Sequence, residues 1–178
     1  MYEGILTCHL TFFLPHVLPC AVMCCRCMMH GFNLVLGSIL AYPWAQELLV
    51  QAQRVVTYFR ASHRPLELVR QAAAQFQISK GLHSANTTRF TSKHECTDSV
   101  ATLQPAFQYV VSTEADAIKN ADVLDILRDP SFWADLPKLN KLQEPLTKVI
   151  KLVQSNRTTL ADVCRCVMCC EKEAAACI

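Results

Sequence analysis

The amino-acid sequence predicts a mainly α-helical protein, with one strand near the N-terminus as the only other element. Three observations predict this class. Apolar residues repeat at spacings of three and four through most of 45–153, which is the period of an amphipathic helix. No alternating apolar and polar run occurs outside the extreme N-terminus. Only four glycines are present and none belongs to a phosphate-binding loop, which excludes P-loop and dinucleotide-binding folds.

The clearest expected helix covers 45–59, with one apolar face and a face of glutamine, glutamate and arginine. Pro43 limits or kinks it upstream. The uncharged run 32–40 before it is expected to form a fully buried helix. The buried face of 45–59 is predicted to contain Leu48, Leu49, Ala52, Val55, Val56 and Phe59.

The segment 62–65 predicts a break, with Pro65 in the first turn of the next helix. The segment 79–91 has no apolar period and contains Gly81, which is typical of a connecting loop. The buried stripe of the helix between them is predicted to be Leu66, Val69, Ala73 and Phe76.

Polar caps and prolines divide the remaining helical region. Ser92 and Glu95 have the spacing of a capping box. Pro105 bends or restarts the helix that follows, and Thr113 opens another that ends at Asp129. The inward-facing residues are predicted to be Val100, Leu103, Phe107, Val110, Ala117, Ala121, Leu124 and Leu127.

A last helix is expected with Asp129 as its N-cap and Pro130 at its first position. Its apolar seam is predicted to comprise Leu139, Leu142, Leu146, Val149 and Val153. Five or six helices are therefore expected. A chain of 178 residues, 52% of them hydrophobic, can build one domain with a sizeable core.

Charge and cysteine usage restrict the cellular context. The 17 basic and 15 acidic residues nearly balance, so any nucleic-acid contact must be local. Every cysteine except Cys96 lies in the end segments 8–27 and 164–177, and the total of eleven is odd. Adjacent cysteines make poor disulfide frameworks. We therefore expect a reducing compartment, the nucleus or the cytoplasm.

Two uncharged segments, 4–25 and 27–45, suggest an alternative, a small membrane-associated protein. A bilayer-spanning helix needs roughly 20 apolar residues, and the first segment is long enough. Pro15, Pro19 and His16 argue against a lipid-exposed helix, because such a helix bears them at a cost. Other interpretations of this segment are a buried element and a stretch that is not native coding sequence.

Cys27 and His30 form a C-x-x-H pair whose side chains would share one face of a helix. Structural zinc normally needs a second ligand pair, which only the cysteines of 164–170 could supply. A zinc-stabilised interaction module is thus a third hypothesis. We favour a packed thiol with a hydrogen-bonded histidine, and predict no metal site.

Two groups of basic residues could neutralise phosphates. A lysine stripe opposite an apolar seam is, however, more often the hydrated side of a helix. The aromatic pair 132–133 is likewise more often core than a base-stacking platform. The two groups are Arg54, Arg60, His63, Arg64 and Arg70, and Lys138, Lys141, Lys148 and Lys151.

Five strings in order along the chain resemble the hAT transposase family, of the type common in fungal genomes. Where that family usually shows Thr-Arg-Trp-Xaa-Ser, this sequence has Phe90 in place of the tryptophan. The strings are CMMHGFNLVL at 27–36, VVTYFRASHRPL at 55–66, TTRFTS at 87–92, the Trp133 helix with its leucines at 131–146, and TTLADV at 158–163.

The resemblance covers 27–163 and implies an interior fragment of an RNase H-like domain with its helical insertion. It leaves outside the hydrophobic Cys-rich segment 1–26, and the Cys-rich tail 164–178, for which disorder is one interpretation. In the family, two aspartates and a glutamate hold the divalent metal that cleaves DNA. The resemblance places all three outside 27–163, and no aspartate precedes Cys27.

We therefore expect a truncated transposase-derived protein that lacks catalytic activity and a cofactor, Mg²⁺ being expected only in an intact family member. The function that we expect to remain is weak binding of DNA or of a protein partner. A full-length transposase copy is one such partner. DNA contacts are expected at Trp133, Arg89, Lys138 and Lys141, with Trp133 placed by the resemblance near a flipped base. Cys27 and His30 are expected to be structural.

Overall fold

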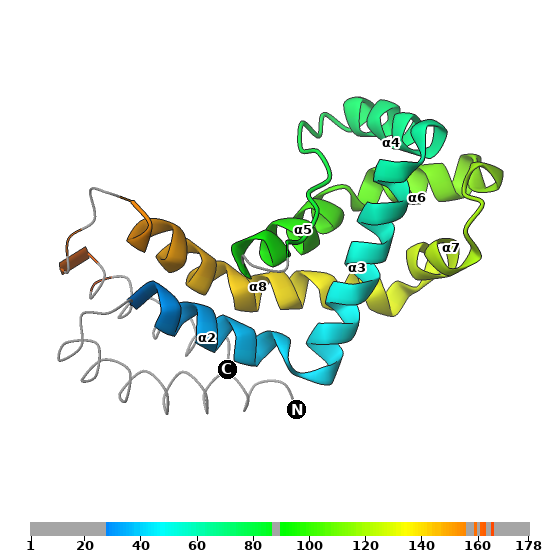
Figure 1. The fold of residues 1–178 in the computed structure, drawn as a ribbon. Coiled ribbons are helices and arrows are strands. Elements are labelled where there is room, and N and C mark those ends of the chain that lie inside the picture. Colours follow the sequence, from blue (N-terminus) through cyan, green and yellow to red (C-terminus); the bar gives the residue numbers. More distant parts are fainter. Residues whose placement is uncertain (1–27, 87–89, 156–158, 160, 163–164, 166–178) are drawn as a thin grey trace. The chain divides into compact units, whose positions relative to one another are not determined.

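The computed structural model describes residues 28–86, 90–155, 159, 161–162 and 165, with the backbone alone at 28–30 and 90. These residues form helices and no strand, which confirms the mainly α class (Figure 1). The expected N-terminal strand lies outside them, as do the expected domain boundaries near 26 and 163. The elements are α2 (Met28–Leu40), α3 (Pro43–Ala61), α4 (His63–Gln75), α5 (Phe90–Thr102), α6 (Gln104–Thr113), the 3-10 turn η1 (Ala115–Ala117), α7 (Ala121–Arg128) and α8 (Pro130–Val153).

The chain divides into two compact units, Pro43–Asn140 and the combination of Met1–Tyr42 with Lys141–Ile178. In the first unit α3 packs against α4, α5 and α7, and α6 packs against α4 and α7. Figure 1 shows the cyan α3 running through this unit, with α4 following its C-terminal end. Helix α3 is therefore the central element of the unit.

The core of the first unit confirms the amphipathic pattern of 45–59. Ala52, Val55, Val56 and Phe59 are completely buried on α3. The ring of Phe59 packs against that of Phe107 on α6, with centroids 5.0 Å apart and planes at 64°. Edge-to-face pairs of this kind stabilise a core beyond simple area burial. The hydrophobic face of α3 thus organises the helices around it.

Several helix boundaries follow from local chemistry, as predicted. Pro65 lies in the first turn of α4, and α6 restarts at Gln104 with Pro105 next to it. Asp129 caps α8, because its carboxylate accepts hydrogen bonds from the Ser131 backbone N–H at 2.8 Å and the Ser131 hydroxyl at 2.7 Å. These hydrogen bonds hold the pKa of Asp129 below its ordinary value, since they favour the charged carboxylate.

Two predictions near the starts of helices are wrong. Helix α5 begins at Phe90, so Ser92 lies inside its first turn instead of capping it. The Ser92 hydroxyl instead accepts a hydrogen bond of 2.7 Å from the backbone N–H of Asn86. The helix expected from Thr113 is interrupted, and α7 begins only after Asn120, whose side chain accepts a hydrogen bond of 3.2 Å from Val123 N–H.

This new cap at Asn120 shifts the buried stripe of the helix that follows. Ala121 was predicted to face inward but is exposed, while Val123, Ile126 and Leu127 are buried. Ala117 is only half-buried, and Ile118 fills the interior position beside it. The periodicity predicted a helix correctly, but the cap decides which residues face inward.

The segment 79–86 has no regular structure, as expected for the described part of the predicted loop. Besides the hydrogen bond between Asn86 and Ser92, three further contacts tie it to the helices. Lys80 forms an ion pair with Asp98, the His83 N–H donates to the Ser99 hydroxyl at 3.1 Å, and the Ala85 N–H donates to Gln53 Oε1 at 2.8 Å. The connection is therefore held in one position against α3 and α5.

Within the second unit, α2 was predicted to be fully buried. This prediction is wrong, because the helix is amphipathic. Leu36, Ile39 and Leu40 are buried, but Leu34 is 51% exposed. The part of α8 that belongs to this unit buries Leu146, Val149 and Ile150, which confirms its apolar seam in part. The same part also buries Gln143 and Thr147.

The end of α4 carries an unusual backbone conformation at Gln77, whose φ is 57°. The Ile78 N–H donates to the Ala73 carbonyl at 2.8 Å, and the Gln77 N–H donates to the Ala74 carbonyl at 3.1 Å. This pair of hydrogen bonds is the Schellman motif, in which glycine usually occupies the left-handed position.

We therefore predict that Gln77→Gly raises the free energy of unfolding by about 0.5 kcal/mol. Relief of left-handed strain, about 1–2 kcal/mol, should exceed the added chain entropy of the unfolded state, about 0.4–1 kcal/mol. Urea denaturation monitored by circular dichroism measures the change. Gln75→Gly, inside α4, is the control and should be destabilising; equal destabilisation by both changes would contradict the prediction.

Candidate nucleic-acid interface

A pocket of about 550 Å³ lies within the unit Pro43–Asn140. It is formed by the end of α3, by α4, by the connection after α4 and by Leu103 at the start of α6. Its buried lining is apolar and its exposed lining is mostly basic, and no acidic residue contributes. The lining residues are Arg60, Leu66, Val69, Arg70, Ala73, Lys80, Gly81, Leu82, His83 and Leu103.

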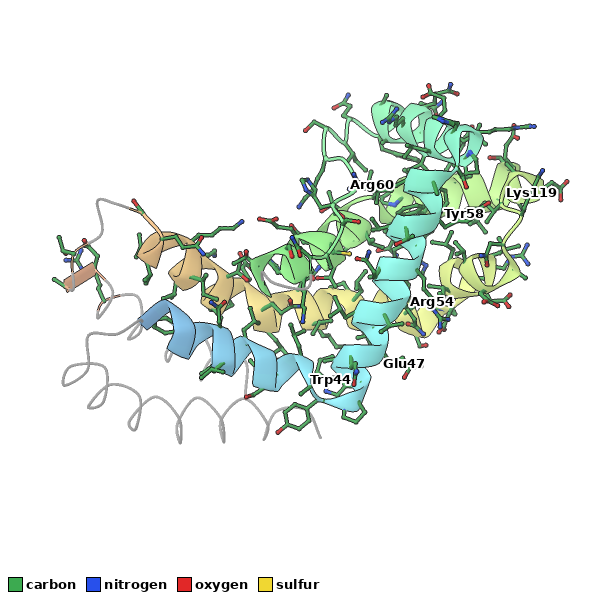
Figure 2. All side chains as sticks on the ribbon, viewed as in Figure 1. Trp44, Glu47, Arg54, Tyr58, Arg60 and Lys119 are labelled. Carbon is green, nitrogen blue, oxygen red and sulfur yellow. The ribbon has the colours of Figure 1, made fainter. Side chains whose placement is uncertain are left out.

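Arg60 lies in the last turn of α3, where a positive charge is favoured by the helix dipole. Its side chain is exposed and forms no ion pair or hydrogen bond with any residue that the structure describes. Figure 2 shows Arg60 and Tyr58 on opposite sides of α3, as expected for positions about 200° apart around a helix axis. Arg60 is therefore directed to this pocket, whereas Tyr58 lines a different one.

Arg70 and Lys80 bring two further charges from other elements. Arg70 is on α4 and lies 3.9 Å from the Glu67 carboxylate, but both side chains are more than half exposed. An exposed pair of this kind is worth little, since water screens it. Lys80 is less exposed and is paired with Asp98. The least compensated charges of the pocket are thus those of Arg60 and Arg70.

A larger hollow of about 830 Å³ lies on the other side of α3 and has a mixed charge. Arg54 and Lys93 contribute positive charge, and Asp122 contributes negative charge. The Tyr58 hydroxyl at its edge accepts a hydrogen bond of 2.9 Å from the Lys119 backbone N–H. Because its charges oppose one another, this hollow is less suited to an anion than the pocket at Arg60.

Trp133, which the resemblance places near DNA, lies in the core and is 7% exposed. Its indole N–H donates a hydrogen bond of 2.9 Å to the Leu127 carbonyl. Its ring packs against Phe132, with centroids 5.0 Å apart, and against Phe107 at 6.2 Å. Base stacking would require the ring to leave these contacts, so its position supports a core role. Its remaining edge lines a separate hollow of about 530 Å³ beside Arg128.

The predicted lysine stripe of α8 is partly neutralised within the helix itself. Lys138 contacts Asp135 at 2.7 Å, and Lys148 contacts Glu144 at 2.8 Å. Lys141 is exposed on the same helix. The i,i+3 and i,i+4 pairs are typical of a hydrated helix face, so these contacts support the alternative interpretation of the stripe.

The residues of the first predicted basic group, 54–70, do not lie together in one site. Only Arg60 and Arg70 meet at the pocket, while Arg64 lies 3.6 Å from Glu114 and Arg54 lines the other hollow. Lys80 and His83 were not among the residues predicted from the sequence. They lie in the predicted loop, and helical periodicity cannot place a loop against a helix.

Three predicted site residues lie wholly or partly outside the part of the chain that the structure describes. Arg89 and Cys27 lie outside the described residues, and the side chain of His30 on α2 does as well. Among the side chains that are described, no group of three or more His, Cys, Asp or Glu is placed to hold a metal ion.

Cys96 is buried, and its Sγ contacts Gln53 Oε1 at 3.5 Å. Burial raises the pKa of this thiol to about 11, because desolvation disfavours the thiolate. Since the thiolate is the nucleophilic form, Cys96 is suited to packing in the core.

The helices within the described ranges include none that combines the length and apolar character needed to cross a bilayer. The first of the two segments proposed as membrane anchors, 4–25, lies outside those ranges. Comparison with protein-family models, with curated proteins and with solved structures gives no match to this chain.

Proposed function

We propose that this chain is a noncatalytic, transposase-derived helical module that binds DNA weakly through the pocket at Arg60. The single observation that carries this proposal is the convergence of Arg60, Arg70 and Lys80 on one pocket whose lining contains no acid. The three residues come from α3, α4 and the following connection. Lys80 is paired with Asp98, so Arg60 and Arg70 are the residues that can neutralise phosphates, about two of them, without reading sequence.

The transposase origin rests on the sequence resemblance over 27–163, including the helical insertion of an RNase H-like domain. In this proposal, the expected cleavage triad is not part of the chain, and the remaining helices supply only binding. A full-length transposase copy is a further proposed partner, and the nucleus or the cytoplasm is the proposed location.

Binding should be weak and strongly dependent on salt. Sequence-independent contacts typically give dissociation constants of about 10⁻⁴–10⁻⁶ M at physiological salt. Neutralising two phosphates predicts a slope of about −2 in a plot of log affinity against log salt. Fluorescence anisotropy of a labelled duplex, measured at several salt concentrations, gives both quantities.

We predict that the double change Arg60→Glu and Arg70→Glu lowers duplex affinity by at least about tenfold and reduces the salt slope by about 2. The matched control is Arg128→Glu, which changes an exposed arginine beside the Trp133 hollow. If the control variant lost binding and the double variant kept it, DNA would be bound near Trp133 and the proposal would be wrong.

Incubation of the wild-type chain with the duplex and Mg²⁺ tests the noncatalytic part of the proposal. The duplex should stay intact, because the resemblance places the metal-binding acids outside 27–163 and no aspartate precedes Cys27. Metal-dependent nicking by the purified chain would overturn that part and leave the binding result to stand on its own.

A further inference from the structure

Two aromatic rings lie next to each other on the surface of the unit Pro43–Asn140. Phe76 is 47% exposed and Tyr109 is 41% exposed. Their centroids are 6.2 Å apart and their planes meet at 76°. Leaving two large rings exposed forgoes the stabilisation that burial would give. An exposed aromatic pair of this kind is therefore typical of a surface that meets a ligand.

Both rings are held on rigid backbone. Phe76 is the C-cap of α4, immediately before the Schellman motif at Gln77. Tyr109 lies within α6, which packs closely against α4. A ligand that contacts these rings would not have to order them first, which lowers the entropic cost of binding.

The aromatic pair is adjacent to the basic pocket. Val69, Arg70 and Ala73 of α4 line that pocket, and Phe76 follows Ala73 by three residues. Residues three apart lie on the same face of a helix. Arg70 and Phe76 are six residues apart, about 9 Å along the helix axis. Positive charge and stacking surface therefore lie close together near the C-terminal end of α4.

We infer that this combined surface binds single-stranded nucleic acid, with unpaired bases against Phe76 and Tyr109 and the backbone phosphates at Arg60 and Arg70. This inference rests on the proposed function and specifies its ligand. Single strands are bound by a basic groove together with exposed aromatic side chains, whereas duplex bases are not available for stacking. The edge-to-face geometry favours this use, because it leaves ring faces that the other ring does not cover.

The charges favour a nucleic acid over a protein partner. An apolar partner helix would need only the rings, and covering the charged Arg70, which lies on α4 six residues before Phe76, would desolvate it at a cost. A polyanion with flat bases uses both features at once. An acidic peptide is the competing ligand, and it is an arm of the test.

The experiment compares an oligothymidine of about 12 nucleotides with an abasic strand of equal length. Both carry the same phosphates, but only the first has bases. The wild-type chain should bind the oligothymidine about tenfold more tightly. Phe76→Ala and Tyr109→Ala should each remove most of this preference while hardly changing the affinity for the abasic strand.

Tyr109→Phe keeps the ring and should keep the preference for oligothymidine. The control is Val50→Ala, which changes an exposed apolar residue elsewhere on the unit. Equal affinity of the wild-type chain for both strands would overturn the inference and leave the proposed function intact. If the wild-type chain bound neither single-stranded nor duplex nucleic acid, both the inference and the proposed function would be wrong. Tyr109-dependent binding of an acidic peptide, without a preference for bases, would assign the rings to a protein partner and also overturn the inference.

Circular dichroism melting shows which variants fold. Should an alanine variant fail to fold, the comparison of the two strands on the wild-type chain and on Tyr109→Phe still decides the question.

Discussion

Replacing Trp133 with alanine should lower the free energy of unfolding by about 3–5 kcal/mol, which is the usual cost of removing a buried tryptophan. The indole packs between Phe132 and Phe107 and is 7% exposed. Its N–H also satisfies the Leu127 carbonyl near the end of α7. The substitution would leave a cavity and an unpaired carbonyl at the same place. Urea denaturation followed by circular dichroism measures the loss.

Trp133→Phe separates the core role from a DNA-binding role. It keeps an aromatic ring but loses the hydrogen bond to Leu127, so we expect a smaller loss of about 1–2 kcal/mol. Affinity for the labelled duplex should not change under conditions where the variant is folded. Unchanged stability together with weakened DNA binding would show instead that Trp133 contacts DNA, as the sequence resemblance implies.

Replacing Gln53 with alanine should destabilise the chain by about 2 kcal/mol, because it leaves a partly buried backbone N–H without its acceptor. Gln53 Oε1 accepts a hydrogen bond of 2.8 Å from Ala85 N–H and also contacts Cys96. Its Nε2 donates to the Thr57 hydroxyl at 3.2 Å. One side chain of α3 thus contacts both the connection after α4 and the middle of α5.

The matched control is Gln51→Ala, a glutamine on the same helix for which no such contact is described. It should change stability by less than about 0.5 kcal/mol. Hydrogen exchange at Ala85 should accelerate in Gln53→Ala and not in the control. Equal stability of the two variants would contradict the view that Gln53 anchors this connection.

Most of the helices could be predicted because the residues that define them act on their neighbours in the sequence. The three-and-four period of α3, the proline starts of α4 and α6, and the Asp129 cap all depend on neighbours within one helical turn. The shifted stripe of α7 was missed because Asn120 was not considered as a cap. The early start of α5 was missed because the Ser92 hydroxyl binds Asn86, a residue of the connection.

The candidate site was much less predictable. Arg60 and Arg70 were recognised as basic, but no pattern separates them from Arg64, which is beside Glu114, or from Arg54, which lines another hollow. Phe76 continued the apolar stripe of α4 and was predicted to be buried, yet it is 47% exposed.

By itself, the sequence determined the mainly α class, the positions of most helices and the breaks between them. These depend on backbone hydrogen bonding and side-chain spacing over a few residues. Only the tertiary structure decided that Trp133 is buried, that Phe76 and Tyr109 are exposed together, and that three basic residues share one pocket. The physical reason is that periodicity gives the direction of a side chain around its own helix, whereas burial and charge clustering depend on which other segment occupies that direction.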